Sequence, residues 1–316
     1  VRSSPPLRVA VAGCGVVGGG ALARLLGDPR FEVVGVLVRD PMKPRDVPGV
    51  AHDRLSRLLV ADASALLERD PDILLEALSE AEAGHALIRA ALQRGVDVAS
   101  ANKQAVSRDP AGLLALAGAH DAKVLWSASI GGGVPMVETL RAARAESSIL
   151  AFEAVLNGTV NFMLERLDAG ATFDVALAEA RAAGLAEEDP SSDLEGFDAA
   201  AKVRLLAFEA FGFMPDEADI PRDVLSAADL PPAGARQLCR CRMANGRLVA
   251  EVRLAASGLD PVFTALKGEG NALKVIAADG SVVHCRGRGA GRWATAESLL
   301  ADLSDLAARR LAHQAG

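Results

Sequence analysis

The chain has 316 residues; 50% are hydrophobic, 24% are charged, and the formal net charge is -7. This length is sufficient for two domains with hydrophobic cores, and the acidic balance argues against a nucleic-acid partner. No apolar run approaches the roughly 18 residues of a membrane span, and the five His and four Cys show no metal-ligand spacing. We therefore expect a cytoplasmic protein with neither a transition metal nor a membrane segment. Because the chain contains no Tyr, a general acid must be Lys, His or a carboxyl group.

A glycine-rich turn joins the first predicted strand, 7–12, to a helix predicted over 21–26. Strand, Gly-x-Gly-x-x-Gly and helix in this order are typical of a dinucleotide-binding domain. The glycines provide a tight turn, close approach of a pyrophosphate and close helix packing, and the helix N-terminus attracts the phosphate. A glycine-rich turn without a ligand is the alternative. The expected cofactor-binding residues are Gly13, Gly15, Val16, Val17 and Gly18.

The second predicted strand, 32–38, ends in Arg39-Asp40, and Lys43 and Arg45 follow closely. In dinucleotide-binding domains the end of this strand meets the adenosine ribose, where an acid favours NAD and a base favours NADP. Three cations against one acid favour NADP, with Arg39 at the 2′-phosphate, and NAD stays the alternative. For Lys43 and Arg45 a solvated turn is the other interpretation.

Short apolar runs then alternate with helical segments as far as Trp126. Strands are predicted at 58–60, 73–75, 96–99 and 123–126, and helices at 63–67, 83–93 and 110–120. This alternation predicts an α/β fold with a Rossmann-type doubly wound parallel sheet. We place this dinucleotide-binding domain at 1–135. A second, α+β substrate domain is expected at 136–292, with strands predicted at 149–156, 237–243, 248–254, 274–276 and 282–285.

The first strand of the second domain ends in Asn157-Gly158-Thr159, and a helix predicted over 161–167 follows. Asn-Gly is typical of a hairpin turn, but a hairpin does not lead into a helix. We therefore expect Asn157, Gly158 and Thr159 to form a substrate-facing loop between strand and helix.

The stretch 180–202 holds the densest group of acidic residues in the chain. Gly184 and Pro190 predict that the acids at 187–193 lie on a loop, and helical spacing from Glu195 places Asp198 and Lys202 on one face. A solvated surface pair is the ordinary interpretation of such spacing. However, a buried Lys held by a carboxylate is a candidate acid/base group, and only six of the 34 basic residues are Lys.

This stretch resembles the signature of the homoserine dehydrogenase family. The residues at the family's spacings are Ala180, Gly184, Leu185, Ala186, Asp189, Pro190, Asp193, Leu194, Gly196, Asp198 and Lys202. Further motifs similar to the family's are Ala101-Asn102-Lys103, the glycine-rich segment 129–135, Asn157 to Phe162, and Gly287 to Gly291. The resemblance covers nearly the whole chain. It implies a short form without a regulatory domain that reversibly reduces L-aspartate 4-semialdehyde to L-homoserine with NAD(P), in threonine, methionine and isoleucine biosynthesis.

The resemblance also implies roles for individual residues. Lys202 is the expected proton donor, held by Asp198, and Lys103 supports the reaction beside the nicotinamide. Glu187 and Asp193 are expected to bind the ammonium group of the substrate.

Other implied features concern the cofactor, an ion and the assembly. Gly289 is expected at the cofactor, and a final helix at 293–316 completes the first domain. Backbone carbonyls of Ile130, Gly132 and Val134 are expected to bind a monovalent cation, Na⁺ or K⁺. The resemblance further implies a homodimer built through the sheet of the second domain.

The chain departs from the family at two places: Ser127 stands where Glu is common, and Ser79-Glu80 where Gly-Gly is usual. A dehydrogenase of the same fold that acts on another small aldehyde or keto acid is therefore one alternative. A non-catalytic NADP-binding regulatory protein is another. The presence of Lys103, Asp198 and Lys202 argues against the latter, because a sensor needs only the glycine loop.

Overall fold

The computed structural model describes residues 5–289 and 292–315. The chain forms two compact units, the first comprising Val1–Ser129 with Arg292–Gly316 and the second Ile130–Gly291. The sequence places the corresponding boundaries after residues 135 and 292. No helix in the described part of the chain is both long and apolar enough to cross a membrane.

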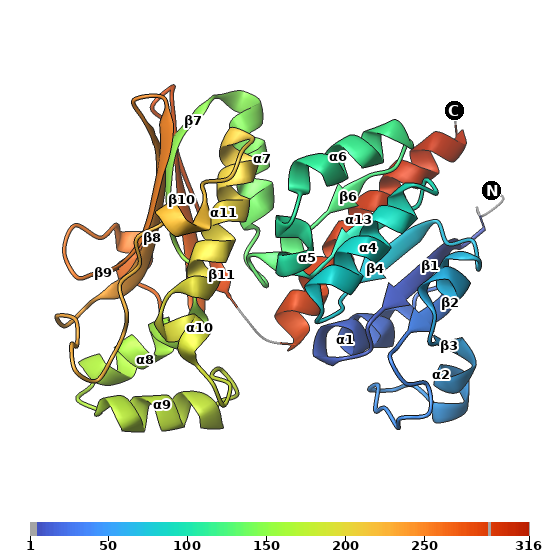
Figure 1. Ribbon diagram of the computed structural model, residues 1–316, viewed down its shortest axis with the longest axis horizontal. Helices are drawn as coiled ribbons and strands as arrows, with labels where there is room; N and C mark the ends of the chain where they lie inside the picture. The colour runs from blue at the N-terminus through green and yellow to red at the C-terminus, as the bar shows by residue number, and fades with distance from the viewer. Residues whose placement is uncertain (1–4, 290–291, 316) are drawn as a thin grey trace. The chain divides into compact units, whose positions relative to one another are not determined.

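In the described part of unit 1, six parallel strands form one sheet in the order β3-β2-β1-β4-β5-β6 (Figure 1). The strands are β1 (Leu7–Ala12), β2 (Phe31–Leu37), β3 (Leu59–Val60), β4 (Ile73–Glu76), β5 (Asp97–Ser100) and β6 (Val124–Leu125). The helices are α1 (Val16–Leu25), α2 (His52–Leu58), α3 (Ala63–Leu67), α4 (Ala81–Leu92), α5 (Lys103–Ser107), α6 (Pro110–Ala119), the 3-10 turn η1 (Ser127–Ser129) and α13 (Arg292–Ala315). This is the strand order of dinucleotide-binding folds, so the predicted doubly wound sheet is confirmed.

Helix α13 belongs to the core of unit 1, although it lies at the other end of the chain. It packs against α1, β4 and β5 and buries an apolar stripe that includes Leu299 and Leu303. Two buried carboxylates fix it. Asp97 on β5 accepts hydrogen bonds from Arg309 and Arg310, and Asp302 on α13 accepts from the backbone N–H and hydroxyl of Ser127. Ser127 therefore holds α13 to the end of the sheet.

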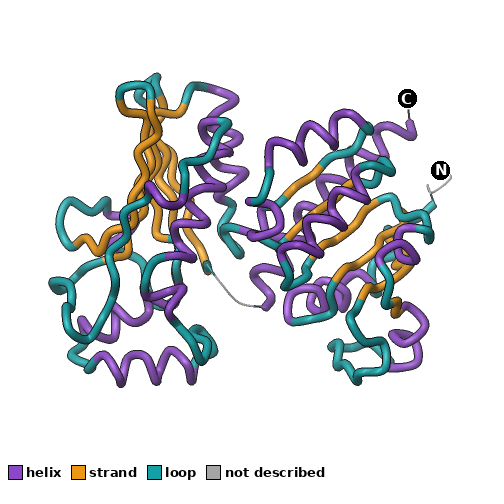
Figure 2. The backbone as a smooth tube through the Cα atoms, viewed as in Figure 1, coloured by secondary structure: helices purple, strands orange, loops and turns teal. Residues whose placement is uncertain are grey.

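Over the described residues of unit 2, five antiparallel strands form a second sheet in the order β11-β10-β7-β8-β9 (Figure 2). The strands are β7 (Ile149–Val155), β8 (Arg236–Ala244), β9 (Arg247–Ala255), β10 (Gly270–Ala277) and β11 (Val282–Arg288). The helices are α7 (Met136–Glu146), α8 (Gly158–Asp168), α9 (Phe173–Ala182), α10 (Ser191–Leu194), α11 (Phe197–Phe211), the 3-10 turn η2 (Glu217–Asp219) and α12 (Pro261–Thr264). Helices α7 and α11 cover one face of this sheet, where Phe152 stacks on Phe211.

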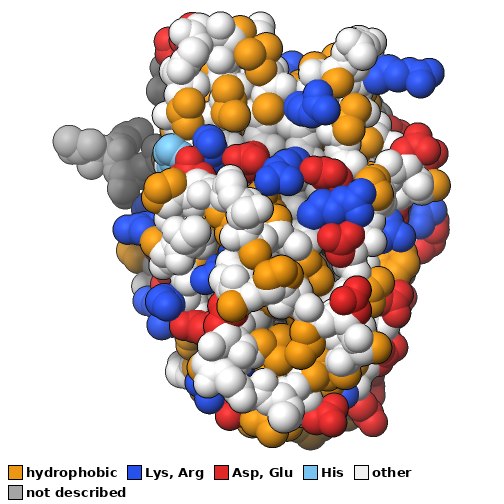
Figure 3. Space-filling view, turned by 90° about the vertical axis from the view of Figure 1, so that its left-hand side faces the viewer, with side chains coloured by type: hydrophobic (Ala, Val, Ile, Leu, Met, Phe, Trp, Pro, Cys, Tyr) orange, Lys and Arg blue, Asp and Glu red, His pale blue; other side chains and the backbone are white. Residues whose placement is uncertain are grey.

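The other face of this sheet carries a row of charged side chains, one from each strand. The residues paired directly across the strands are His284, Lys274, Glu153, Arg240 and Glu251. Directly opposed residues project from the same face, and opposite charges then stabilise the pairing. Ion pairs join Lys274 to Glu153 (3.4 Å), Glu153 to Arg240 (3.0 Å) and Arg240 to Glu251 (3.4 Å). Figure 3 shows this face, with basic and acidic side chains alternating in a band beside hydrophobic ones.

The acid-rich segment differs locally from the sequence-based expectation. The predicted loop over 187–193 is wrong in its second half, because 191–194 form the single turn α10. Helix α11 begins at Phe197 and not at Glu195, because Gly196 has a φ of 75°, which an α-helix does not allow. Helix α8 begins at Gly158, earlier than the predicted 161, because the Asn157 side chain accepts a hydrogen bond from the Val160 N–H and caps it.

Candidate active site

The glycine-rich turn after β1 has the shape of a phosphate-binding loop. Gly13 has a φ of 93°, and a Cβ there would lie 2.4 Å from the Ala77 carbonyl oxygen. A Cβ on Gly18 would lie 2.0 Å from the Gly13 carbonyl oxygen. By contrast, no described atom lies within 4 Å of a Cβ built on Gly15. Two glycines thus allow close packing, and the third leaves open space where α1 begins.

Helix α1 begins at Val16 directly after this open position. Gly15 occupies its N-cap and supplies no side-chain hydrogen bond. The first N–H groups of a helix need acceptors, and together with the helix dipole they attract an anion. Gly15, Val16 and Val17 therefore present backbone donors suited to a pyrophosphate.

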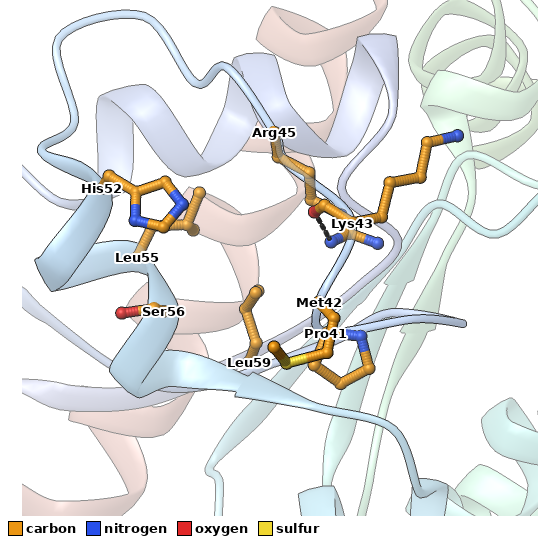
Figure 4. A pocket seen from close by; sticks show the side chains of 8 residues that line it. All are labelled: Pro41, Met42, Lys43, Arg45, His52, Leu55, Ser56 and Leu59. Atoms are coloured by element: carbon orange, nitrogen blue, oxygen red, sulfur yellow. Dashed lines mark hydrogen bonds between the residues drawn. The ribbon is translucent and has the colours of Figure 1, made fainter.

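The end of β2 carries the predicted ribose-binding residue. Arg39 is exposed, and its Nη2 lies 2.5 Å from Oε1 of Glu80, the residue that precedes α4. The loop after Arg39 and helix α2 line a pocket of about 140 Å³, drawn in Figure 4. Its lining residues are Pro41, Met42, Lys43, Arg45, His52, Leu55, Ser56 and Leu59. In this pocket Arg45 donates to the Lys43 carbonyl oxygen at 2.6 Å, and the Lys43 amine points away from the other lining side chains.

Lys103 is the first residue of α5, a helix that the sequence analysis did not predict. Asn102 caps this helix, because its Oδ1 accepts a hydrogen bond from the Ala105 N–H (3.0 Å). Its Nδ2 donates to Glu76 Oε1 (3.3 Å) and to the Glu80 carbonyl oxygen (3.2 Å). Asn102 thus fixes the start of α5, and with it the backbone of Lys103, against the end of β4 and the residue that precedes α4.

Glu76, at the end of β4, is a buried residue that the sequence analysis missed. Its carboxylate also accepts hydrogen bonds from the Ser100 hydroxyl (2.6 Å) and the Leu78 N–H (2.9 Å). Burial raises the pKa of Glu76, and the hydrogen bonds from Ser100, Leu78 and Asn102 oppose the rise. A single acid that ends an otherwise apolar strand was the signal available in the sequence.

In unit 2, Asp198 and Lys202 meet as their spacing predicts. Lys202 Nζ donates to Asp198 Oδ2 at 2.7 Å and to the Leu156 carbonyl oxygen at 2.8 Å. The two side chains are only 18% and 16% exposed. A carboxylate and a strand-end carbonyl therefore fix the direction of the amine, while a small exposed fraction leaves it accessible to a bound molecule.

Asn157 joins this pair to Asp193. Its Nδ2 donates to Asp193 Oδ1 (2.7 Å) and to Asp198 Oδ2 (3.0 Å), so one amide bridges two carboxylates. Burial raises the pKa of Asp193; nearby Asp198 adds to the rise, and the Asn157 bond and Lys202 oppose it. Thr159 lies in the first turn of α8 and not in the predicted loop, and its hydroxyl donates to the Leu185 carbonyl oxygen at 2.7 Å. The cluster combines one amine with two carboxylates, which suits a zwitterionic ligand.

The remaining predicted residues lie in different settings. Glu187 is exposed on the segment before α10, where its carbonyl oxygen accepts from Arg181. Gly289 is buried, and a Cβ there would lie 1.9 Å from Asn271 Nδ2, a packing reason for glycine that the sequence did not reveal. Asn271 is itself fully buried and donates to the Leu156 carbonyl oxygen at 3.1 Å. Of the Gly287–Gly291 motif, Ala290 and Gly291 lie outside the described residues.

The proposed cation ligands lie in the segment before α7. The Val134 carbonyl oxygen accepts from the Met136 N–H (2.8 Å), and a Cβ on Gly131 would lie 2.1 Å from that oxygen. Among the described residues, no group of three or more His, Cys, Asp or Glu is placed to hold a metal ion. The backbone-bound monovalent ion stays a prediction.

Comparison with known proteins gives a consistent result. A model of homoserine dehydrogenase matches residues 135–304, and a model of the homoserine dehydrogenase NAD-binding domain matches residues 13–127. A homoserine dehydrogenase of Mycobacterium bovis is 30% identical over 97% of this chain and 73% of its own length. This chain belongs to the homoserine dehydrogenase family. The family and its class of reaction, an NAD(P)-dependent oxidoreduction, are therefore as the sequence predicts.

Further matches define the extent of the similarity. A homoserine dehydrogenase of Corynebacterium glutamicum is 39% identical over 64% of this chain, which spans about half (47%) of that relative's length. A crystal structure of a homoserine dehydrogenase from Thiobacillus denitrificans superposes with a TM-score of 0.83, at 27% identity, over 97% of this chain and 74% of its own. This likeness confirms the predicted fold class of both units.

Two matches concern the cofactor. An NAD(+)-dependent homoserine dehydrogenase of Pseudomonas canavaninivorans is 31% identical over 81% of this chain and 75% of its own length. A hyperthermophilic archaeal homoserine dehydrogenase, solved in complex with NADPH, has a TM-score of 0.81 at 24% identity over 96% of this chain and 98% of its own. Both cofactors thus occur with this fold.

Proposed function

We propose that this chain reduces L-aspartate 4-semialdehyde to L-homoserine, with Lys202 as the proton donor. The observation that carries the proposal is the amine of Lys202, held between Asp198 and the Leu156 carbonyl oxygen within a mostly buried cluster. Reduction of an aldehyde develops negative charge on its oxygen, and a positioned ammonium both stabilises that charge and supplies the proton. When bound, the nicotinamide cofactor supplies the hydride that is added to the aldehyde carbon.

Asp198 acts through Lys202. A charge-assisted hydrogen bond is short and strong, so Asp198 keeps the amine in one direction and compensates its charge. Leu156 contributes a neutral acceptor, which leaves the third N–H of the ammonium for the substrate oxygen. Lys103 carries a second positive charge at the start of α5 and stabilises the developing alkoxide electrostatically.

The substrate carries an ammonium group, for which the acidic residues of unit 2 are suited. Asp193 is partly buried and is aligned by Asn157. A bound ammonium favours the ionised form of Asp193, so the substrate offsets the cost of burying this carboxylate. Glu187, on the neighbouring exposed segment, contributes further negative charge.

For the cofactor we propose NADPH, with NADH as a weaker substitute. The glycine turn and the start of α1 would hold the pyrophosphate, and Arg39 would pair with the 2′-phosphate. The bases Lys43 and Arg45 add positive charge to the same loop. One relative is named for NAD(+) and another was solved with NADPH, so we keep NADH as the alternative cofactor.

The direct test is the rate of NADPH oxidation with aspartate semialdehyde, repeated with NADH and with a panel of small aldehydes and keto acids. Saturable turnover selective for the semialdehyde is expected. Tight NADPH binding with turnover of a different carbonyl compound would refute aspartate semialdehyde as the substrate and would support NADPH as the cofactor. Binding without turnover of any of them would refute the enzymatic proposal.

We further propose a homodimer formed through the charged face of the second sheet. Lys274, Glu153, Arg240 and Glu251 alternate in sign along one row. In a dimer whose twofold axis passes between Glu153 and Arg240, the rows of the two copies run in opposite directions. Each basic residue of one copy then faces an acidic residue of the other. Light scattering is expected to give twice the chain mass, and Arg240→Glu to give the monomer. A control at the half-buried Arg166, which pairs with Glu179, should leave the dimer intact when changed in the same way.

A monovalent cation is proposed near Ile130, Gly132 and Val134, whose carbonyl oxygens are neutral ligands. A carbonyl oxygen has two lone pairs, so that of Val134 can accept from Met136 and still contact an ion. Replacing Na⁺ and K⁺ by choline should lower kcat, and adding K⁺ should restore it. An unchanged kcat in choline would refute the ion.

A further inference from the structure

Arg39 and Glu80 stand on either side of the glycine-rich turn. Arg39 follows β2 and Glu80 follows β4, and these two strands flank β1 in the sheet. The segment that leads to Glu80 lies directly against the turn, because the Ala77 carbonyl oxygen would be 2.4 Å from a Cβ on Gly13. All three segments therefore meet at the carboxyl edge of one sheet, where ligands bind in folds of this type.

An ion pair spans this edge. Arg39 Nη2 lies 2.5 Å from Glu80 Oε1, although the two side chains are 82% and 61% exposed. Packing does not hold such exposed side chains, so their mutual attraction sets the geometry. Glu80 is the N-cap of α4, yet its side chain does not cap that helix within the described structure and reaches Arg39 instead. Its backbone is fixed by Asn102, which donates to the Glu80 carbonyl oxygen.

We propose that Glu80 is a specificity-determining residue that competes with the 2′-phosphate of NADPH for Arg39. This inference rests on the proposed function, in which Arg39 meets the 2′-phosphate. To bind the phosphate, Arg39 must leave Glu80, and the freed carboxylate then stands near a second anion. The ribose of NADH has a 2′-hydroxyl in that position, which can donate a hydrogen bond to a carboxylate. Glu80 thus weakens NADPH binding, supports NADH binding and broadens the use of cofactors.

The test is the equilibrium Kd of NADPH and of NADH, measured by titration calorimetry on the full chain. In Glu80→Gln, NADPH should bind about fivefold more tightly, the upper range for an exposed ion pair, while NADH binds equally or more weakly. The matched control is Glu82→Gln. Glu82 lies in the first turn of the same helix and pairs with Arg108 at 2.7 Å, so its substitution makes the same charge change without affecting Arg39.

A double-mutant cycle separates competition for Arg39 from a general effect of charge. In an Arg39→Gln background, Glu80→Gln should change the Kd of NADPH much less than in the wild type, and added salt should shrink the wild-type effect. Equal gains from Glu80→Gln and Glu82→Gln, or an equal gain in the Arg39→Gln background, would overturn the inference. A wild-type chain that binds neither dinucleotide would instead overturn the proposed function.

Discussion

Replacing Asp198 by Asn tests the role of the Lys202 amine most directly. The substitution keeps the shape of the side chain, and its oxygen can still accept from Asn157 and from Lys202. What it removes is the negative charge 2.7 Å from the amine. Hydrogen bonds to charged groups contribute about 1.5–3 kcal/mol, roughly twice the value of neutral ones. If all of that difference, about 0.75–1.5 kcal/mol, acts in the transition state, kcat should fall between about threefold and about tenfold.

The assay is steady-state NADPH oxidation with aspartate semialdehyde, together with the Kd of NADPH. The Kd should not change, because Asp198 is not among the predicted cofactor-binding residues. Glu179→Gln is the matched control, because Glu179 forms a comparable pair with Arg166 at 2.5 Å on a more exposed surface. A kcat of Asp198→Asn within about twofold of the wild type, with native circular dichroism, would refute a catalytic Lys202 held by Asp198.

Three further predictions concern buried groups. Gly289→Ala should destabilise the protein by about 1–3 kcal/mol, and Asn271→Ala in the same chain should recover part of the loss in urea unfolding. Asp97→Ala should cost about 3 kcal/mol in the same assay, because Arg309 and Arg310 lose a fully buried partner. The raised pKa of Glu76 means that its contribution to stability is present at low pH and is lost as pH rises through the folded-state value. Glu76→Gln lacks this loss, so its unfolding free energy relative to wild type should increase as pH rises above the ordinary pKa range of a glutamate.

The sequence revealed those parts of the site that follow from local rules. Gly13 and Gly18 are required by contacts within a single turn, so their spacing alone identified the loop. Asp198 and Lys202 are four residues apart on α11, and helix geometry is enough to bring them together. The parallel sheet followed in the same way from alternating apolar runs and helical segments.

Contacts between distant segments were not predictable in this way. Glu76 and Ser100 meet because β4 and β5 are neighbours, and Gly289 meets Asn271 across the start of the β10–β11 hairpin. Neither pair has a periodic signal, since each depends on strand register. The short helix α10 was missed for a different reason: a single turn after Pro190 has too few residues to show helical spacing.

Asn102 and Asn157 have the same arrangement in the two units. Each uses its Oδ1 to cap the helix that follows, and its Nδ2 to bind a carboxylate: Glu76 in one case, Asp193 and Asp198 in the other. Asp is as good a cap as Asn but has no amide donor. Asn157→Asp should therefore keep α8 capped while it places a third carboxylate against two others. Asn157→Ala removes both the cap and the amide.

The two substitutions at this position distinguish the roles. If the amide matters mainly for the carboxylates, Asn157→Asp should lower kcat more than Asn157→Ala. Both substitutions remove the amide donor, but Asn157→Asp also adds a negative charge that repels Asp193 and Asp198. If capping of α8 dominates, Asn157→Ala should be the more destabilised in urea, by about 1 kcal/mol, and Asn157→Asp should keep wild-type kcat. The second result would mean that Asn157 serves the fold of the loop and not the orientation of Asp198 beside Lys202.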